Sequence, residues 1–165
     1  MFHSIIRPYR DALSIHGAAK FSAAGFLARM PLALIGLGVL LYISNTTGSY
    51  SLAGFLQAVF VISAALAAVI SSRMSDRYGQ RIILIILPSL FTLTLFLFVY
   101  AVSSELSRVI QTFLVVIAGA TFPSFGSLVR TRWAHVTSQK EPLLNSAFAW
   151  ESVLDELIFT IGPIV

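Results

Sequence analysis

The ten residues Ser72–Arg81, with the sequence SRMSDRYGQR, lie between two long apolar runs, at about Ser51–Ser71 and Ile82–Val102. The link carries three arginines and one aspartate. Its Gly79 is the residue best able to adopt a backbone conformation that reverses the chain. Apolar runs of this length on both sides of so short a charged link predict two helices that cross a membrane and turn back at its surface.

Composition places the rest of the chain in the membrane as well. Hydrophobic residues make up 57% of the 165 residues and charged residues 11%, which leaves too little polar surface to cover a soluble domain. The apolar runs lack the alternation of a β-barrel strand, so the predicted fold class is an all-α membrane protein. A helical bundle of five transmembrane helices is expected, at about Phe21–Ile43, Ser51–Ser71, Ile82–Val102 and Val109–Val129, with a fifth that starts near Ala147.

The positions of lysine and arginine predict the orientation, because short loops rich in these residues stay on the cytoplasmic side. With a cytoplasmic N-terminus, only Arg108 falls in an outer link and only Arg29 inside a span. Residues 1–17 are then a cytoplasmic N-terminal segment and residues 18–165 the transmembrane bundle of a multi-pass protein of the plasma or inner membrane. The net charge of +4 follows from this topology and needs no nucleic-acid partner. The basic residues on the inner side are Arg7, Arg10, Lys20, Arg73, Arg77, Arg81, Arg130, Arg132 and Lys140.

The charged link resembles a known loop. In the major facilitator superfamily, the loop between the second and third spans is usually written G-x-L-x-D-R-x-G-R-K, and the link fits it at five positions. Two positions differ: the first glycine of the motif and the first of the motif's two closing basic residues are replaced in this chain. The fitting residues are Met74, Asp76, Arg77, Gly79 and Arg81, and the replacements are Ser72 and Gln80.

The resemblance implies the front part of a twelve-helix carrier that moves a small solute by alternating access. It also implies that the link takes part in gating on the cytoplasmic side. The alternative is that the link is a turn that only fixes the orientation of the chain. Because the chain ends at Val165 within the fifth predicted span, we expect an N-terminal part of a longer protein; a complete five-span protein is the alternative. The gating residues implied are Ser72, Asp76, Arg77, Gly79 and Arg81.

Ionisable residues inside the predicted spans are the candidates for coupling solute transport to an ion. Placing each charged side chain at mid-membrane costs at least about 2.5 kcal/mol, so such residues are seldom kept without a role. They are Arg29 in the first span and Glu151, Asp155 and Glu156 in the fifth. Glu151 and Asp155 share a helix face, whereas Glu156 is turned about 100° away. In the superfamily the first span lies near the fifth, so we expect Arg29 to pair with Asp155 and Glu151 or Glu156 to bind a proton or cation. One basic and three acidic groups leave a surplus of negative charge.

Two of these residues have structural alternatives. Pro31 cannot donate a hydrogen bond to the carbonyl of Leu27, and the guanidinium of Arg29 could satisfy that group instead. Glu151 could lie in water near the cytoplasmic mouth.

Prolines mark expected helix bends, at Pro31 in the first span and at Gly162-Pro163 in the fifth. The second pair resembles the centre of the superfamily motif G-x8-G-x3-G-P-x2-G-G, which is associated with exporters that exchange substrate for protons. Ala149 and Ile158 stand where the motif has its earlier glycines. The resemblance favours export, and a simple kink explains the pair equally well.

The sequence predicts no enzyme, no metal site and no cofactor. Its histidines, His3, His16 and His135, lie outside the spans, and no Ser-His pair, metal-spaced cluster or phosphate-binding glycine loop is present. A channel would need a filter or a repeated polar loop. The predicted function is secondary transport of a small molecule, with the lipid bilayer as surroundings and protons as the coupling ion. A non-transporting membrane scaffold or the product of a degraded gene is the alternative.

Overall fold

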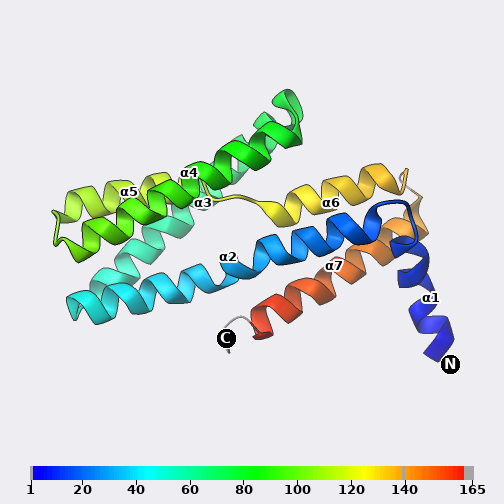
Figure 1. Ribbon diagram of the computed structural model, residues 1–165, viewed down its shortest axis with the longest axis horizontal. Coiled ribbons are helices and arrows are strands. Elements are labelled where there is room, and N and C mark those ends of the chain that lie inside the picture. The colour runs from blue at the N-terminus through cyan, green and yellow to red at the C-terminus, as the bar shows by residue number, and fades with distance from the viewer. Residues whose placement is uncertain (1, 139, 162–165) are drawn as a thin grey trace. The chain divides into compact units, whose positions relative to one another are not determined.

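The computed structural model describes residues 2–138 and 140–161, and the side chains of residues 7–138 and 140–161. Within these residues the chain is helical and contains no strand (Figure 1), which confirms the all-α fold class. The helices are α1 (Phe2–Leu13), α2 (Ala18–Thr47), α3 (Tyr50–Tyr78), α4 (Gln80–Ser103), α5 (Arg108–Ala120), α6 (Phe125–Val136) and α7 (Glu141–Ile161).

Four segments of the described chain are long and apolar enough to cross a membrane. They are α2, α3, α4 and the segment Arg108–Val136, which contains α5 and α6. The fifth predicted span corresponds to α7, but α7 carries four acidic residues and is not among these segments. The count of five spans therefore stays a prediction.

The link between the second and third spans is much shorter than its charges suggested. Helix α3 continues to Tyr78 and α4 begins at Gln80, so Gly79 alone separates them. Gly79 has a φ of 87°, a conformation that side chains with a Cβ rarely adopt, and its N–H still donates to the carbonyl of Ser75. Ser72, Asp76 and Arg77 thus lie on the last turns of α3.

The fourth predicted span, Val109–Val129, is interrupted. Helix α5 ends at Ala120 and α6 begins at Phe125. Pro123 explains the break, since it has no N–H to donate and it disfavours helical geometry at Phe122 before it. The ring of Phe122 packs edge-on against Phe60 and Phe91, at 5.4 Å from each centroid, and this contact holds the end of the segment in place.

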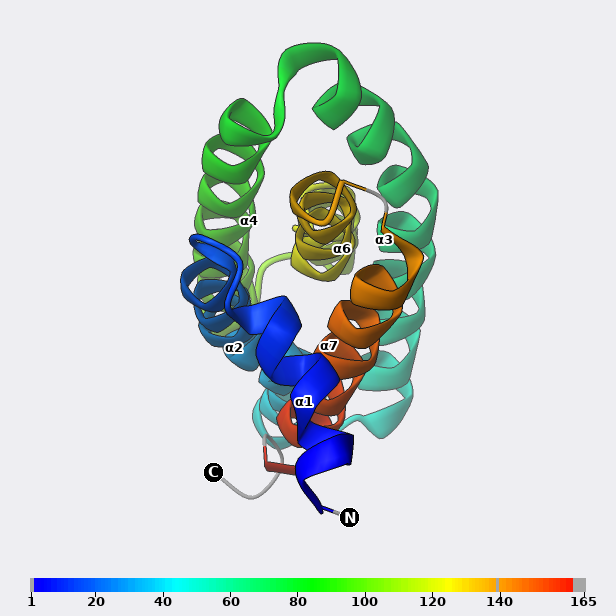
Figure 2. The ribbon, with the colours of Figure 1, turned by 90° about the vertical axis from the view of Figure 1, so that its right-hand side faces the viewer.

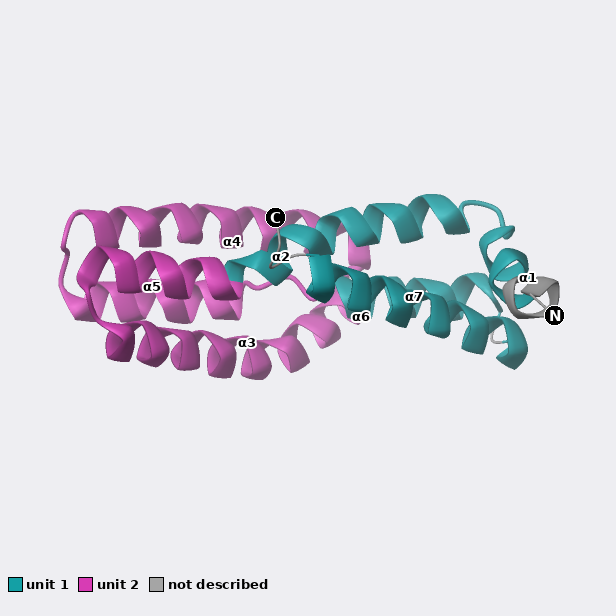
Figure 3. Cartoon of the chain, turned by 90° about the horizontal axis from the view of Figure 1, so that it is seen from below, with its two compact units in different colours: residues 1–35, 125–165 teal, residues 36–124 magenta. Residues whose placement is uncertain are grey.

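The chain divides into two compact units, shown in different colours in Figure 3. Unit 2, residues 36–124, packs α5 against α3 and α4. The outer sides of these helices are apolar too: Leu66 and Phe96 are 70% and 71% exposed, as expected for side chains that face lipid. Its buried core contains Ile43, Leu52, Ala53, Leu56, Phe98, Val102 and Val115.

Unit 1, residues 1–35 and 125–165, contains the start of α2 together with α1, α6 and α7. The N-terminal segment predicted for residues 1–17 contains α1, which packs against α7 (Figure 2). Ala12 of α1 is fully buried and the ring of Tyr9 lies 6.4 Å from that of Trp150. The buried core of unit 1 contains Ala12, Ala18, Val129, Trp133 and Ala147.

Packing of α5 on α3 requires a glycine at position 119. A Cβ there would lie 2.6 Å from the carbonyl oxygen of Phe60 and 2.7 Å from the Cβ of Ser63, so the helices would have to separate. We expect Gly119→Ala to lower the stability of the purified protein by about 1–3 kcal/mol, as overpacking usually does. Thermal unfolding in detergent measures the loss.

The matched control is Gly126→Ala, at the other glycine of the segment Arg108–Val136, where a Cβ meets nothing within 4 Å. The control should unfold at the wild-type temperature or slightly above it. Equal losses in the two variants would contradict the close contact between α5 and α3.

Candidate functional site

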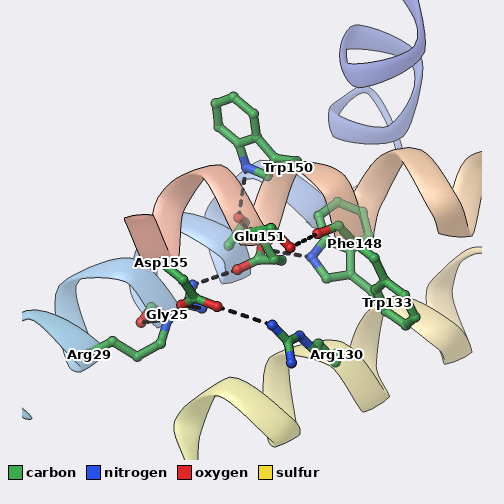
Figure 4. Close-up of polar contacts among 10 residues, drawn as sticks. Gly25, Arg29, Arg130, Trp133, Phe148, Trp150, Glu151 and Asp155 are labelled. Carbon is green, nitrogen blue, oxygen red and sulfur yellow. Dashed lines mark hydrogen bonds and ion pairs between the residues drawn. The ribbon is translucent and has the colours of Figure 1, made fainter. Parts of the chain in front are cut away.

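Three helices of unit 1 meet around a cluster of charged side chains (Figure 4). Helices α2 and α6 approach closely at Gly25, where a Cβ would lie 2.5 Å from Cγ2 of Val129. Helix α7 packs against α6 and contributes Ala147 to the same core. The small residues let the backbones come near enough for polar side chains to meet.

Arg29 of α2 connects that helix to α7. Its Nη1 donates to Oδ1 of Asp155 at 2.6 Å, and its Nη2 donates to Oε2 of Glu151. The remaining nitrogen, Nε, donates to the carbonyl oxygen of Gly25 at 3.0 Å. All three nitrogens are therefore engaged, and the side chain is only 9% exposed. Such a buried guanidinium is stable only because its charge is paired on two sides.

Glu151 is the most deeply buried member of the cluster, with a side chain exposure of 0%. Besides Arg29, two neutral donors hold it: the indole N–H of Trp133 at 2.8 Å and the hydroxyl of Ser22 at 2.6 Å, both on Oε1. The Ser22 hydroxyl accepts in turn from the indole N–H of Trp150, at 3.2 Å. Glu151 is thus an acceptor of three hydrogen bonds, the arrangement that suits an ionised carboxylate.

Asp155 lies one helical turn further along α7 and is shared by two arginines. Its Oδ1 accepts from Arg29, and its Oδ2 accepts from Nη2 of Arg130 on α6 at 3.1 Å. Its side chain is 27% exposed and that of Arg130 is 50% exposed. The edge of the cluster formed by Asp155 and Arg130 is therefore open to the surroundings, whereas the edge formed by Glu151 is buried.

The structure brings together Arg29, Glu151 and Asp155, three of the four ionisable residues singled out from the sequence. The fourth, Glu156, is exposed and forms no ion pair within the described chain. Arg130 takes its place, so two arginines face two carboxylates. The expected surplus of negative charge is absent from the cluster.

The two structural alternatives for these residues do not hold. Arg29 donates to the carbonyl of Gly25, not to that of Leu27 freed by Pro31. Pro31 itself lies inside α2, which continues as a helix to Thr47. Glu151 is buried among donors, so it does not lie in water near the mouth of the bundle.

Sequence reasoning missed several members of the cluster. In the sequence, Arg130 indicates only the orientation of the chain, and Ser22 and Trp133 carry no charge that would single them out. The spacing of Arg130 from Val129 and Trp133 places them on one side of α6, but nothing in the sequence says that α7 covers that side.

The remaining predicted residues lie elsewhere. Ser72, Asp76, Arg77 and Arg81 are exposed at the junction of α3 and α4, where Arg77 rests 5.5 Å from the ring centroid of Tyr78. Asp76 makes no ion pair or side-chain hydrogen bond with any described residue. The predicted bend at Gly162 and Pro163 lies outside the described residues.

Metal ligands do not gather anywhere in the described part of the chain: no three His, Cys, Asp or Glu side chains come together there. At the cluster, both carboxylates already accept from arginine, so their oxygens are occupied by donors. The cluster thus holds two carboxylates between two guanidinium groups, with Glu151 fully buried and Asp155 partly exposed.

Comparison with known families gives the class of protein. The sequence profile of the Major Facilitator Superfamily matches residues 21–165, and the chain belongs to this superfamily. Its members are membrane transporters that contact lipid and a small-molecule substrate, and they are not enzymes. Searches among curated proteins and among solved structures gave no match.

The Trp133 donor can be tested by removing only its N–H. Trp133→Phe leaves an aromatic ring against Phe21 but takes one hydrogen bond from a fully buried carboxylate. We expect a loss of stability of about 1.5–3 kcal/mol, typical for hydrogen bonds to charged groups. Thermal unfolding of the purified protein measures it.

Trp150→Phe is the matched comparison, because the Trp150 indole donates to a hydroxyl and not to the carboxylate. Its loss should be smaller, about 0.5–1.5 kcal/mol. A Trp133→Phe protein as stable as wild type would show that the indole does not hold Glu151.

Proposed function

We propose that the chain is the front part of a proton-coupled secondary carrier, which moves a small solute across a cell membrane by alternating access. The supporting observation is the cluster of Arg29, Arg130, Glu151 and Asp155, in which one edge is closed and the other is open. Charged groups inside a helical membrane bundle are costly, and a functional role is the usual reason for keeping them.

In this proposal α7 is the fifth span. Its 21 residues are long enough for the hydrocarbon core, since a helix rises about 1.5 Å per residue. Its two acidic residues at mid-helix are paired with arginines of α2 and α6, which removes the main objection to placing them in the membrane. Residues 18–165 then form the incomplete N-terminal half of a twelve-helix fold.

The proposed orientation has a cytoplasmic N-terminus in a plasma or inner membrane, because most basic residues then lie inside. The proposed direction is export, which rests on the resemblance of Gly162-Pro163 to the exporter motif. A scaffold that transports nothing is the competing function, and it gives no reason for a partly exposed carboxylate between two arginines.

Asp155 is the residue proposed to load and unload the proton. In the full-length gene product reconstituted in liposomes, Asp155→Asn should reduce proton-driven solute flux to the level of empty liposomes, because the amide cannot ionise. The assay follows any solute that the wild-type protein moves when a pH gradient is imposed. Glu141→Gln, the same chemical change at an exposed residue of α7, is the control and should leave the flux unchanged.

Proton-driven flux in the Asp155→Asn protein would remove this residue from the coupling mechanism. A folded wild-type protein that moves no solute under any gradient would favour the scaffold.

The gating proposal concerns Asp76. Since it has no partner within the described chain, its replacement should not destabilise this part of the protein; its effect must come from contacts made elsewhere during the transport cycle. We expect Asp76→Asn to change the ratio of inward-open to outward-open protein by about fivefold. This factor lies at the lower end of those found for coupling between two sites in a protein. Residues 1–165 contain no cysteine, so Ala149→Cys on α7, with any cysteine of the rest of the gene product replaced by serine, can report this by its labelling rate.

Glu105→Gln is the control, because it also turns an exposed carboxylate into an amide, in the link between α4 and α5. The labelling rate should match that of wild type. An unchanged rate in Asp76→Asn as well would leave the link as a turn that only fixes orientation.

A further inference from the structure

Basic side chains from four parts of the chain gather at one end of unit 1. The end of α1 and the start of α2 lie there together with the end of α6 and the start of α7 (Figure 1). Ala12, Ala18, Trp133 and Ala147 come from these four helices and share one buried core. We call this region the basic end of unit 1. Its basic residues are Arg7, Arg10, Lys20, Arg132 and Lys140.

The charges of the basic end do not balance. Its five basic residues stand beside only two acidic ones, Asp11 and Glu141, and all seven side chains are exposed. None of the five basic side chains forms an ion pair with a described residue. The guanidinium of Arg132 lies 5.3 Å from the ring centroid of Phe21, which brings no negative charge. The basic end therefore keeps a surplus of positive charge that attracts an anionic partner.

The membrane spans place the basic end at the surface of the bilayer. Helix α2 begins at Ala18, the segment Arg108–Val136 ends at Val136, and both are long and apolar enough to cross a membrane. Lys20 and Arg132 each lie within about one helical turn of these span ends. At this depth, lysine and arginine side chains meet the phosphate groups of the lipids. The nearest available anions are therefore phospholipid headgroups.

Helix α1 suits a position along that surface. Its 12 residues are too few to cross the hydrocarbon core, which takes about 20. One face of α1 packs on α7, with Ala12 fully buried and the ring of Tyr9 lying 6.4 Å from that of Trp150. Arg7 and Arg10 remain exposed. In the sequence, apolar residues recur at amphipathic spacing, at Phe2, Ile5, Ile6, Tyr9 and Leu13.

We propose that the basic end of unit 1 binds the headgroups of anionic phospholipids, with Arg7 and Arg10 of α1 as its main contacts. A guanidinium donates two parallel hydrogen bonds to phosphate oxygens, which makes arginine well suited to this ligand. The headgroups then hold α1 on its exposed side, while α7 holds it on its buried side. The inference goes beyond the proposed function and does not depend on transport.

The first test compares two lipids that differ in headgroup charge. The full-length gene product, purified in detergent, is titrated with phosphatidylglycerol, which is anionic, and with phosphatidylcholine of the same acyl chains, which is zwitterionic. Native mass spectrometry counts the lipid molecules that each protein molecule retains. We expect phosphatidylglycerol to bind more tightly, and sodium chloride to reduce the difference, because salt screens exposed charges.

Variants assign the preference to α1. The double variant Arg7→Gln/Arg10→Gln should bind phosphatidylglycerol about 25-fold more weakly, since each basic residue near an anionic surface contributes about fivefold. Its binding of phosphatidylcholine should not change. Asp11→Asn removes an opposing charge from the same helix, so it should tighten the binding of phosphatidylglycerol.

The matched control is Arg73→Gln/Arg108→Gln, which also removes two exposed arginines but lies outside the basic end. It should keep the wild-type preference for phosphatidylglycerol. An equal loss in this control would show that only the total charge matters and would overturn the proposed site.

A second measurement follows α1 itself in a bilayer. Hydrogen exchange of the backbone amides of α1 is compared in nanodiscs of phosphatidylglycerol and of phosphatidylcholine. If headgroups hold α1 against α7, its local opening becomes rarer, and we expect exchange about tenfold slower in phosphatidylglycerol. In Arg7→Gln/Arg10→Gln the two lipids should give the same exchange rate.

Three further results would overturn the proposal. The first is equal affinity of the wild-type protein for the two lipids. The second is an Arg7→Gln/Arg10→Gln protein that still prefers phosphatidylglycerol as wild type does. The third is displacement of phosphatidylglycerol by sodium glycerol 1-phosphate at an ionic strength where sodium chloride leaves the lipid bound, which would indicate a site for a soluble anion.

Discussion

The double ion pair of Arg29 is the interaction on which the arrangement of unit 1 depends. It joins α2 to α7 across more than 120 residues of sequence, through Glu151 and Asp155. In a low-dielectric bundle, a guanidinium without partners would cost several kcal/mol, and so would either carboxylate. The three side chains are therefore stable only when both helices are in place.

The two carboxylates of the cluster are stabilised by different surroundings. Around Glu151 it supplies an indole N–H and a hydroxyl in addition to Arg29, so that the negative charge is fully hydrogen-bonded away from water. Around Asp155 it supplies a second arginine that is itself half-exposed. The first environment encloses its carboxylate completely, and the second leaves its carboxylate partly exposed.

Close backbone packing makes these contacts possible. At Gly25 the missing side chain lets α2 approach Val129 of α6, and Arg29 and Arg130 follow those residues on their respective helices. Pro123 ends the preceding helical segment and allows α6 to begin afresh at Phe125. Within unit 2, Gly119 serves the same purpose for α5 against α3.

The sequence by itself determined the membrane class, the helical fold and the positions of four long apolar segments, because lipid demands long apolar runs and helices satisfy their own backbone. It also identified Arg29, Glu151 and Asp155, since ionisable residues stand out within such runs. Only the tertiary structure decided that Arg130, Ser22 and Trp133 complete the cluster and that Glu156 does not. Nothing in the sequence distinguishes these residues from others of their type. Which partners they contact depends on which helix faces pack together, and no local sequence pattern specifies that packing.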